Sequence, residues 1–242
     1  VNNNFDEKNP IKKNNKINTK IYKTISQEKQ LDELIKKLDE KSVIAVDTET
    51  SSLNPQDADL VGVSVSYEAN EAFYIPIGHK EKTELKKEVI LKKLKPILED
   101  PSIKKVGQNI KYDFIIFKKN DIELSSVEDT MLLSYTLDAG NNRHNMDTLS
   151  ELHLSHKTIS YKDLVGTGKK QLNFADVDIK SATEYAAEDA DITLRLYEVL
   201  SERVSEEKLE RVYEEFEKPM IKILSKLETM GINCLLYTSD AA

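Results

Sequence analysis

Hydrophobic and polar residues recur with two different periods along this chain. Leu31, Leu34, Ile35 and Leu38 have the spacing of the buried face of an amphipathic helix, and this helix is expected to begin after Ser26, a residue type that often caps helices. The pattern predicts a helix that serves packing rather than chemistry.

Short runs of apolar and β-branched residues follow. The run at 42–47 predicts a buried strand that ends in a carboxylate, Asp47. The segments 60–67 and 72–77 predict two further strands, and the short connections favour an antiparallel meander. Another short strand is predicted at 105–108.

The second half of the chain has the helical period. The predicted helices cover 85–98, 129–137, 146–154, 181–200 and 206–230. Pro96 is expected to kink the first of them. The last carries an apolar stripe that requires a partner surface. Strands followed by helices predict a mixed α/β fold.

Composition narrows the class of protein. With 242 residues the chain is long enough for one or two domains with a buried core. A net charge of −8 excludes binding of nucleic acid by bulk charge, so any such contact must be local. A single cysteine, Cys234, excludes an internal disulfide framework, and there is no long apolar run or signal-peptide pattern. We expect a cytoplasmic protein without membrane contact.

Both ends of the chain differ from its middle. Residues 1–20 are rich in Asn and Lys and poor in apolar side chains, which predicts a disordered linker. Residues 233–242 have neither helical periodicity nor capping residues and are expected to be a foreign or artefactual tail.

Three short motifs place acidic groups in pairs. Asp47 and Glu49 are two residues apart on a strand, so both project from one face. Asn109 precedes Asp113 by four residues at a predicted helix start. The same helical spacing separates a phenol and a carboxylate in the motif from residue 185 to residue 189. Each pair is therefore expected to point at one place.

Four carboxylates at one place need cations. Without them the charges would repel and raise one another's pKa. Oxygen ligands favour Mg²⁺ or Mn²⁺ over Zn²⁺. Two such ions about 4 Å apart are the arrangement used to hydrolyse phosphodiesters. Tyr185 is expected to hydrogen-bond the attacking water without serving as a ligand.

The motifs Asp-Thr-Glu, Asn-x-x-x-Asp and Tyr-x-x-x-Asp, in this order, resemble the exonuclease motifs of the Tyr-containing branch of the DEDD superfamily. The sequence around these motifs is similar to the proofreading 3′–5′ exonuclease domain of bacterial DNA polymerase I. The segments that carry this resemblance are 106–113, 129–132, 146–149, 156–159 and 185–191. It extends over about residues 20 to 232, nearly the whole predicted ordered chain.

This resemblance implies a ribonuclease-H-like α/β fold, with a mixed five-stranded sheet of antiparallel meander and parallel strands flanked by helices. It implies an exonuclease domain at 21–204, and at 205–232 the first helix of a polymerase domain that is otherwise missing. The parent protein would contain its own polymerase and 5′ nuclease domains. The implied substrate is a single-stranded or mismatched DNA 3′ end, from which nucleoside 5′-monophosphates are released in DNA replication and repair. A monomer near the bacterial nucleoid is expected.

The resemblance also implies roles for individual residues. Asp47, Glu49 and Asp189 would hold the cation that carries the attacking water, and Asp47 with Asp113 would hold a second one. Tyr185 with Glu49 would orient the water. The implied substrate-binding residues are Thr48, Leu53, Gln108, Asn109, Lys111, Tyr112, Arg143 and Tyr161. Tyr161 stands where many relatives have Phe, which should preserve stacking.

Other interpretations of the same residues stay open. A ribonuclease-D-like exonuclease and a catalytically silent spacer domain are the alternative functions. His153 and His156 have a spacing compatible with zinc, but no third ligand is evident, and surface histidines are favoured. Lysines around the two middle motifs are candidate phosphate contacts, namely Lys104, Lys105, Lys111, Lys118, Lys119, Lys157, Lys162, Lys169 and Lys170.

Overall fold

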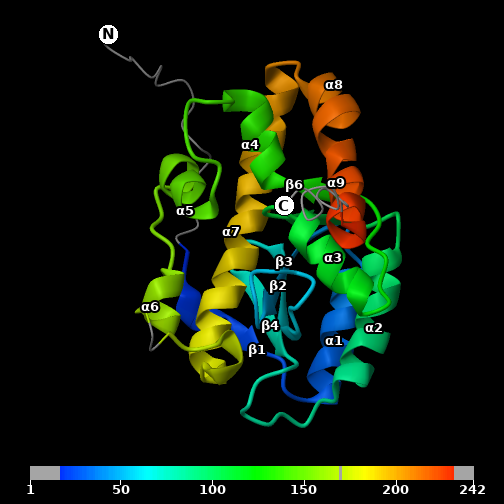
Figure 1. Ribbon diagram of the computed structural model, residues 1–242, viewed down its shortest axis with the longest axis vertical. Helices are drawn as coiled ribbons and strands as arrows, with labels where there is room; N and C mark the ends of the chain where they lie inside the picture. Colours follow the sequence, from blue (N-terminus) through cyan, green and yellow to red (C-terminus); the bar gives the residue numbers. More distant parts are fainter. Residues whose placement is uncertain (1–16, 169–170, 232–242) are drawn as a thin grey trace, which may run out of the picture.

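The computed structural model describes residues 17–168 and 171–231. Their centre is a six-stranded mixed sheet in the order β1-β4-β3-β2-β5-β6 (Figure 1). β2, β3 and β4 form an antiparallel meander, and β1, β5 and β6 pair in parallel with their neighbours. The strands are β1 (Lys23–Thr24), β2 (Val43–Thr50), β3 (Leu60–Glu68), β4 (Glu71–Pro76), β5 (Lys104–Gly107) and β6 (Val127–Asp129).

The predicted mixed sheet is confirmed, but its predicted count of five strands is wrong. Two short edge strands, β1 and β6, were not located by the sequence pattern. β1 has two residues and pairs only with β4, while β6 has three residues and pairs only with β5. Runs this short show no measurable alternation, so pairing alone defines them.

Alternation along the central strands separates two faces. Ile44 and Val46 of β2 pack into the main core with α1 (Glu28–Asp39), α2 (Lys87–Glu99) and α3 (Lys111–Lys119). The intervening side chains of β2 face the long helix α7 (Ile179–Glu206), which crosses the other face of the sheet (Figure 1). Asp47 and Glu49 belong to this second set.

Small residues allow α7 to lie close to the sheet. Ala182, Ala186 and Ala187 are fully buried at this contact. Asp178 caps the helix by accepting a hydrogen bond from the Ser181 N–H at 2.9 Å. The helix is thereby held with one face, which includes Asp189, against the centre of the sheet.

Gly62 of β3 provides a further close approach. The ring of Tyr74, on the neighbouring strand β4, covers this glycine so closely that an added Cβ would lie 2.0 Å from the phenol oxygen. Tyr74 is fully buried and its hydroxyl pairs with Nε2 of His79 at 2.7 Å. Only glycine leaves room for this ring, directly opposite Glu49 in the β2–β3 register.

The remaining helical segments lie along α7 and beside α3 (Figure 1). They are α4 (Thr130–Asp138), α5 (Met146–Leu149), the π-helix η2 (Ser150–Leu154), α6 (Tyr161–Val165), α8 (Glu210–Val212), the π-helix η5 (Tyr213–Glu217) and α9 (Lys218–Met230). Single-turn 3₁₀ helices lie at η1 (Thr19–Ile21) and η4 (Phe174–Asp176).

The single helix predicted at 206–230 is wrong at its start. Residue 206 is the end of α7, and Lys208 then takes a left-handed conformation with φ 59° before a new helical segment begins. The apolar stripe of this segment is only partly covered, because Ile221 is buried near α3 whereas Phe216 and Leu227 stay exposed. The predicted stripe therefore exists, and most of it is open.

Several expectations concern residues that lie outside the described part of the chain. These are most of the linker at 1–20, the tail at 233–242 with Cys234, and the lysines at 169 and 170. Among the described helices, none has the length and apolar character needed to cross a membrane.

Candidate active site

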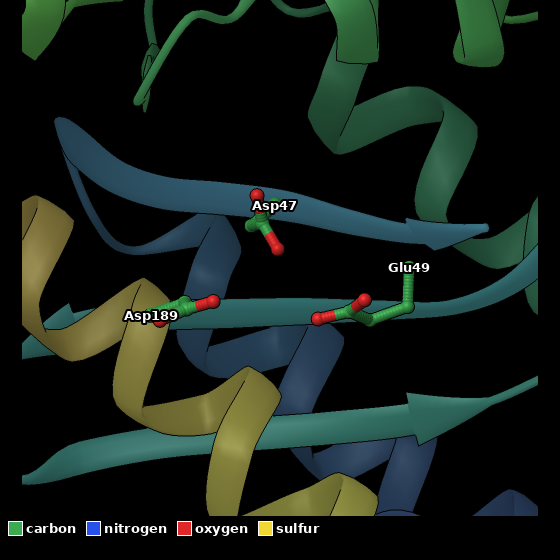
Figure 2. Close-up of side chains that lie close together, drawn as sticks. All are labelled: Asp47, Glu49 and Asp189. Carbon is green, nitrogen blue, oxygen red and sulfur yellow. The ribbon is translucent and has the colours of Figure 1, made fainter. Parts of the chain in front are cut away.

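Three carboxylates converge where α7 crosses β2. Asp47, Glu49 and Asp189 each offer an oxygen within 4.8 Å of the others. Figure 2 shows the two strand carboxylates and the helix carboxylate pointing into one space. The structure therefore brings together acids that are 142 residues apart in the chain.

The strand explains why two of these acids share a direction. Asp47 and Glu49 are separated by one residue, so the pleat sends both toward α7. The pairing of β2 with β3 shifts register between Glu49 and Thr50. This irregularity ends the regular strand directly after the second acid and leads the chain into the loop at 51–59.

The fourth predicted acid, Asp113, lies beside this trio rather than within it. It is 3% exposed and accepts hydrogen bonds from Thr48, one from the backbone N–H at 2.9 Å and one from the hydroxyl. Burial, followed by the charge of Asp47, raises the pKa of Asp113, whereas the Thr48 hydrogen bonds lower it. Asp113 therefore lies near enough to Asp47 for the two charges to repel, but it falls outside the group of three converging carboxylates.

The start of α3 sets the direction of Asp113. Asn109 has φ 58°, a left-handed conformation, just before the helix. Its N–H and that of Ile110 each donate to the carboxylate of Asp129 at 3.0 Å. The same carboxylate caps α4 by accepting from the N–H of Met131. A buried acid outside the predicted motifs therefore fixes the turn from which Asp113 extends.

The electrostatics of the cluster favour bound cations. Burial raises the pKa of Asp47 to about 6, and burial together with the other acids raises the pKa of Glu49 and of Asp189 well above the usual range. Within the residues that the structure describes, no Lys, Arg or His forms an ion pair with any of the three. Partly buried carboxylates without a basic ion-pair partner offer only oxygen donors, which suits a divalent ion such as Mg²⁺.

Tyr185 lies one helical turn before Asp189. Burial, then the charges of Asp189, Glu49 and Asp47, raise the pKa of its hydroxyl far above the usual value. The group stays protonated at any physiological pH and can donate a hydrogen bond. Its ring meets the ring of Tyr161 edge-on with centroids 6.0 Å apart, and a tilted Phe174 ring at 6.1 Å. These aromatic contacts fix the phenol beside the carboxylates.

Three of the predicted substrate contacts lie around this cluster. Leu53 is 93% exposed on the loop after β2, and Tyr161 is 37% exposed at the start of α6. The Tyr112 hydroxyl pairs with the Thr50 hydroxyl at 2.6 Å and donates to the carbonyl of Ser52. Two exposed side chains thus stand on different elements, and a third supports the loop.

Other predicted substrate contacts are engaged within the protein. Gln108 donates from Nε2 to the carbonyl of His144 at 2.7 Å and accepts from the Thr130 hydroxyl. The Lys111 ammonium forms an ion pair with Glu228 of α9. Arg143 is exposed. Thr48 donates hydrogen bonds to Asp113, and the Asn109 N–H donates to Asp129.

The expectation that lysines around the two middle motifs contact phosphate is wrong for Lys105. This side chain is fully buried in β5, where its ammonium donates to the carbonyls of Asp100 and Ile103 at 2.6 Å each. Burial lowers its pKa to about 8. Lys104 stays exposed and donates to the Tyr197 hydroxyl at 3.3 Å. Lys118, Lys157 and Lys162 are exposed.

The sequence pattern did not predict that Glu188 is a buried hydrogen-bond acceptor. This acid is 1% exposed and accepts from the backbone N–H of Ile159 at 2.6 Å, with Nε2 of His156 2.8 Å from its other oxygen. It ties the segment before Tyr161 to α7. The prediction of surface histidines is wrong for His153, which is 8% exposed. Only the adjacency of Glu188 to Asp189 could have drawn attention to it.

Comparison with known proteins agrees with this geometry. Residues 22–205 match the family model of the 3′–5′ exonuclease. The chain belongs to the 3′–5′ exonuclease family. DNA polymerase I of Rhizobium leguminosarum is 42% identical over 231 residues, and that of Pseudomonas aeruginosa is 41% identical over 217. Each alignment covers 87% of this chain but only 23% and 24% of the relative, so the chain spans about a quarter of the length of these relatives.

The 3′–5′ exonucleases are hydrolytic nucleases that act on nucleic acid and depend on divalent metal, which fits the acidic cluster. Solved structures show the same fold. Brucella melitensis NrnC has a TM-score of 0.64 at 23% identity, covering 87% of this chain and 92% of its own. The POL domain of Pol1 from M. smegmatis has a TM-score of 0.67 at 17% identity, covering 87% of this chain and 32% of its own.

Proposed function

We propose that this chain hydrolyses single-stranded or mismatched DNA from its 3′ end with two divalent cations, Mg²⁺ or Mn²⁺, and releases nucleoside 5′-monophosphates. The observation that carries the proposal is the meeting of Asp47, Glu49 and Asp189 within 4.8 Å, with Asp113 buried and hydrogen-bonded to Thr48. Its support from the comparisons is the family match over residues 22–205.

The residues that would hold the cations follow from this arrangement. Asp47, Glu49 and Asp189 would hold one ion. Asp47 with Asp113 would hold a second. Bound there, such ions would supply Lewis acidity, which lowers the pKa of water so that hydroxide can attack a phosphodiester, and which stabilises charge on the leaving oxygen.

The protein's own side chains orient the reactants. The protonated Tyr185 hydroxyl donates and the Glu49 carboxylate accepts, so together they define the direction of an attacking water. Tyr161 offers an exposed ring for stacking on a terminal base, and Leu53 offers an apolar wedge. Stacking contributes about 1–3 kcal/mol per base, which favours an unpaired end over a duplex.

The setting of the activity is proposed from the relatives. Both curated relatives cited above are DNA polymerase I, which suggests proofreading beside a polymerase and a 5′ nuclease domain, in a monomer near the bacterial nucleoid. In this interpretation residues 21–204 form the exonuclease domain and 205–232 begin the polymerase domain.

A ribonuclease-D-like function is the second candidate, because NrnC and Trypanosoma brucei RNase D share the fold. One assay separates the candidates. A 5′-labelled single-stranded DNA oligonucleotide and an RNA oligonucleotide of the same sequence are incubated with the protein in Mg²⁺, in EDTA, and with Asp47→Ala. We expect shortening of the DNA from its 3′ end only with intact protein and Mg²⁺.

Two results would contradict the proposal. Faster degradation of RNA than of DNA would favour the ribonuclease-D-like function. DNA binding without metal-dependent cleavage would favour a catalytically silent spacer domain.

A further inference from the structure

The loop at 51–59 connects the acidic strand to the rest of the meander and presents Leu53. Its two ends are joined, because the Ser51 N–H donates to the carbonyl of Asp59 at 3.0 Å and the Asp59 N–H donates to Oγ of Ser51 at 2.9 Å. Between these ends, Leu53 is 93% exposed. An apolar side chain so far in solvent has no packing of its own, so the loop backbone alone determines where it stands.

One ammonium group holds that backbone. Lys119 donates from Nζ to the carbonyls of Pro55, Gln56 and Ala58, each at 2.8 Å. An ammonium has three N–H donors, and here three converging loop carbonyls use all of them. Hydrogen bonds to a charged donor are about twice as strong as neutral ones. The loop is thus folded around a cation supplied from another element.

The element that supplies this cation is α3, the helix that also carries Asp113. Asp113 lies near its first turn and Lys119 is its last residue. The same rigid helix therefore fixes one acid of the cluster at one end and the shape of the loop at the other. The loop has further ties. The Tyr112 hydroxyl of the same helix donates to the carbonyl of Ser52, and the carbonyl of Glu228 in α9 accepts from Nε2 of Gln56 at 3.0 Å.

We propose that Lys119 is a positioning residue, which sets Leu53 at a fixed place relative to the acidic cluster so that the last base of a DNA strand is separated from its neighbour. This inference rests on the proposed exonuclease function and assigns to Lys119 the selection of frayed over paired 3′ ends. The group does this through the loop carbonyls and without contact to the phosphate.

A direct phosphate contact is the competing explanation for a lysine near a nuclease site. The two differ in what arginine can do. Arginine keeps the charge that a phosphate needs, but its planar fork does not reproduce three donors converging on three carbonyls. Lys119→Arg should therefore fail to restore positioning, although it would restore a phosphate contact.

The test compares Lys119→Met and Lys119→Arg with Lys92→Met, which removes an exposed lysine of α2. Three kinds of substrate are used, namely a single-stranded oligonucleotide, a pair of duplexes with a matched and a mismatched 3′ end, and the p-nitrophenyl ester of thymidine 5′-monophosphate. The ester has no second base to separate and reports on the acidic cluster alone.

We expect both Lys119 variants to lose roughly tenfold in kcat/KM on the oligonucleotide and to lose preference for the mismatched end, with ester hydrolysis within about twofold of wild type. Lys92→Met should match wild type on all three. In a Leu53→Ala background, Lys119→Met should cause no further loss, because both changes remove the same placed side chain.

Several outcomes would overturn the inference. Recovery in Lys119→Arg would assign a phosphate contact, and additive losses with Leu53→Ala would show that Lys119 does not act through the loop. A parallel loss of ester hydrolysis would mean that the cluster itself is disturbed. Failure of the proposed function is distinguishable, since wild type would then hydrolyse neither the ester nor the oligonucleotide.

Discussion

Thr48 donates both its backbone N–H and its hydroxyl to the same oxygen of Asp113. These bonds stabilise the ionised carboxylate in a buried setting that otherwise favours the protonated form. Removing the hydroxyl in Thr48→Val should raise the pKa of Asp113 further and weaken Mg²⁺ binding. We expect the Mg²⁺ concentration for half-maximal activity at pH 7 to rise about three- to tenfold, which corresponds to about 1 kcal/mol for one hydrogen bond.

Thr48→Ser is the matched control, because it keeps the hydroxyl. It should need nearly the wild-type Mg²⁺ concentration. Equal requirements in the valine and serine variants would show that the hydroxyl contributes nothing to Asp113.

The acidic cluster should destabilise the protein when no metal is bound. The pKa of Asp47 is raised from an ordinary 3.8 to about 6 by burial. A raised carboxyl pKa favours folding below pH 3.8, and this contribution is lost as the pH rises through about 6. In EDTA, Asp47→Asn should therefore have little effect on Tm at pH 4 and should stabilise the protein by about 1–3 kcal/mol at pH 7.

At pH 7, saturating Mg²⁺ should make the wild type more stable than Asp47→Asn, because only the intact cluster gains stability from the ion. Thermal melts of both proteins in EDTA and in Mg²⁺ give this comparison. A Tm difference that is the same with and without Mg²⁺ would argue against Asp47 as a ligand.

Removing the Tyr185 hydroxyl should reduce turnover without harming the fold. The ring contacts with Tyr161 and Phe174 survive in Tyr185→Phe. The donor that orients the attacking water is lost, so kcat should fall about ten- to a hundredfold while the stabilisation by Mg²⁺ is unchanged. Single-turnover cleavage and thermal melts measure the two effects, and a wild-type kcat would remove Tyr185 from the mechanism.

Gly62 should tolerate no side chain. In Gly62→Ala the new methyl would lie 2.0–2.4 Å from three atoms of the Tyr74 ring, so the buried ring must move. Overpacking of this kind costs about 1–3 kcal/mol, measurable by urea denaturation. Gly62→Ala combined with Tyr74→Leu should cost less than the sum of the two single changes, and simple additivity would show that the ring is not the obstacle.

The acidic strand shows how far the sequence pattern reaches. Alternation along 43–50 is sufficient to predict that Asp47 and Glu49 share a face, because the period of a strand is two. The helical period similarly predicts α1 and the part of α7 around Asp189. These two periodicities, together with the short sequence motifs, were sufficient to predict a mixed α/β fold and to single out Asp47, Glu49 and Asp189.

The edges of the fold depend on distant partners. β6 contains Glu128, an acid that reads as exposed in the sequence, yet it is 4% exposed because the Lys218 ammonium and the Tyr213 hydroxyl each lie 2.9 Å from it. Both partners come from residues more than 80 positions later. For the same reason the burial of Lys105 was not predictable, since it depends on carbonyls placed by tertiary structure.

The acidic cluster also has a consequence for biosynthesis. Asp47 and Glu49 lie on β2 and are synthesised before Asp189, which lies on α7. Under the proposed function, a nascent chain that lacks α7 has an incomplete set of cation ligands. Hydrolysis of a phosphodiester would then begin only after α7 has packed against the sheet.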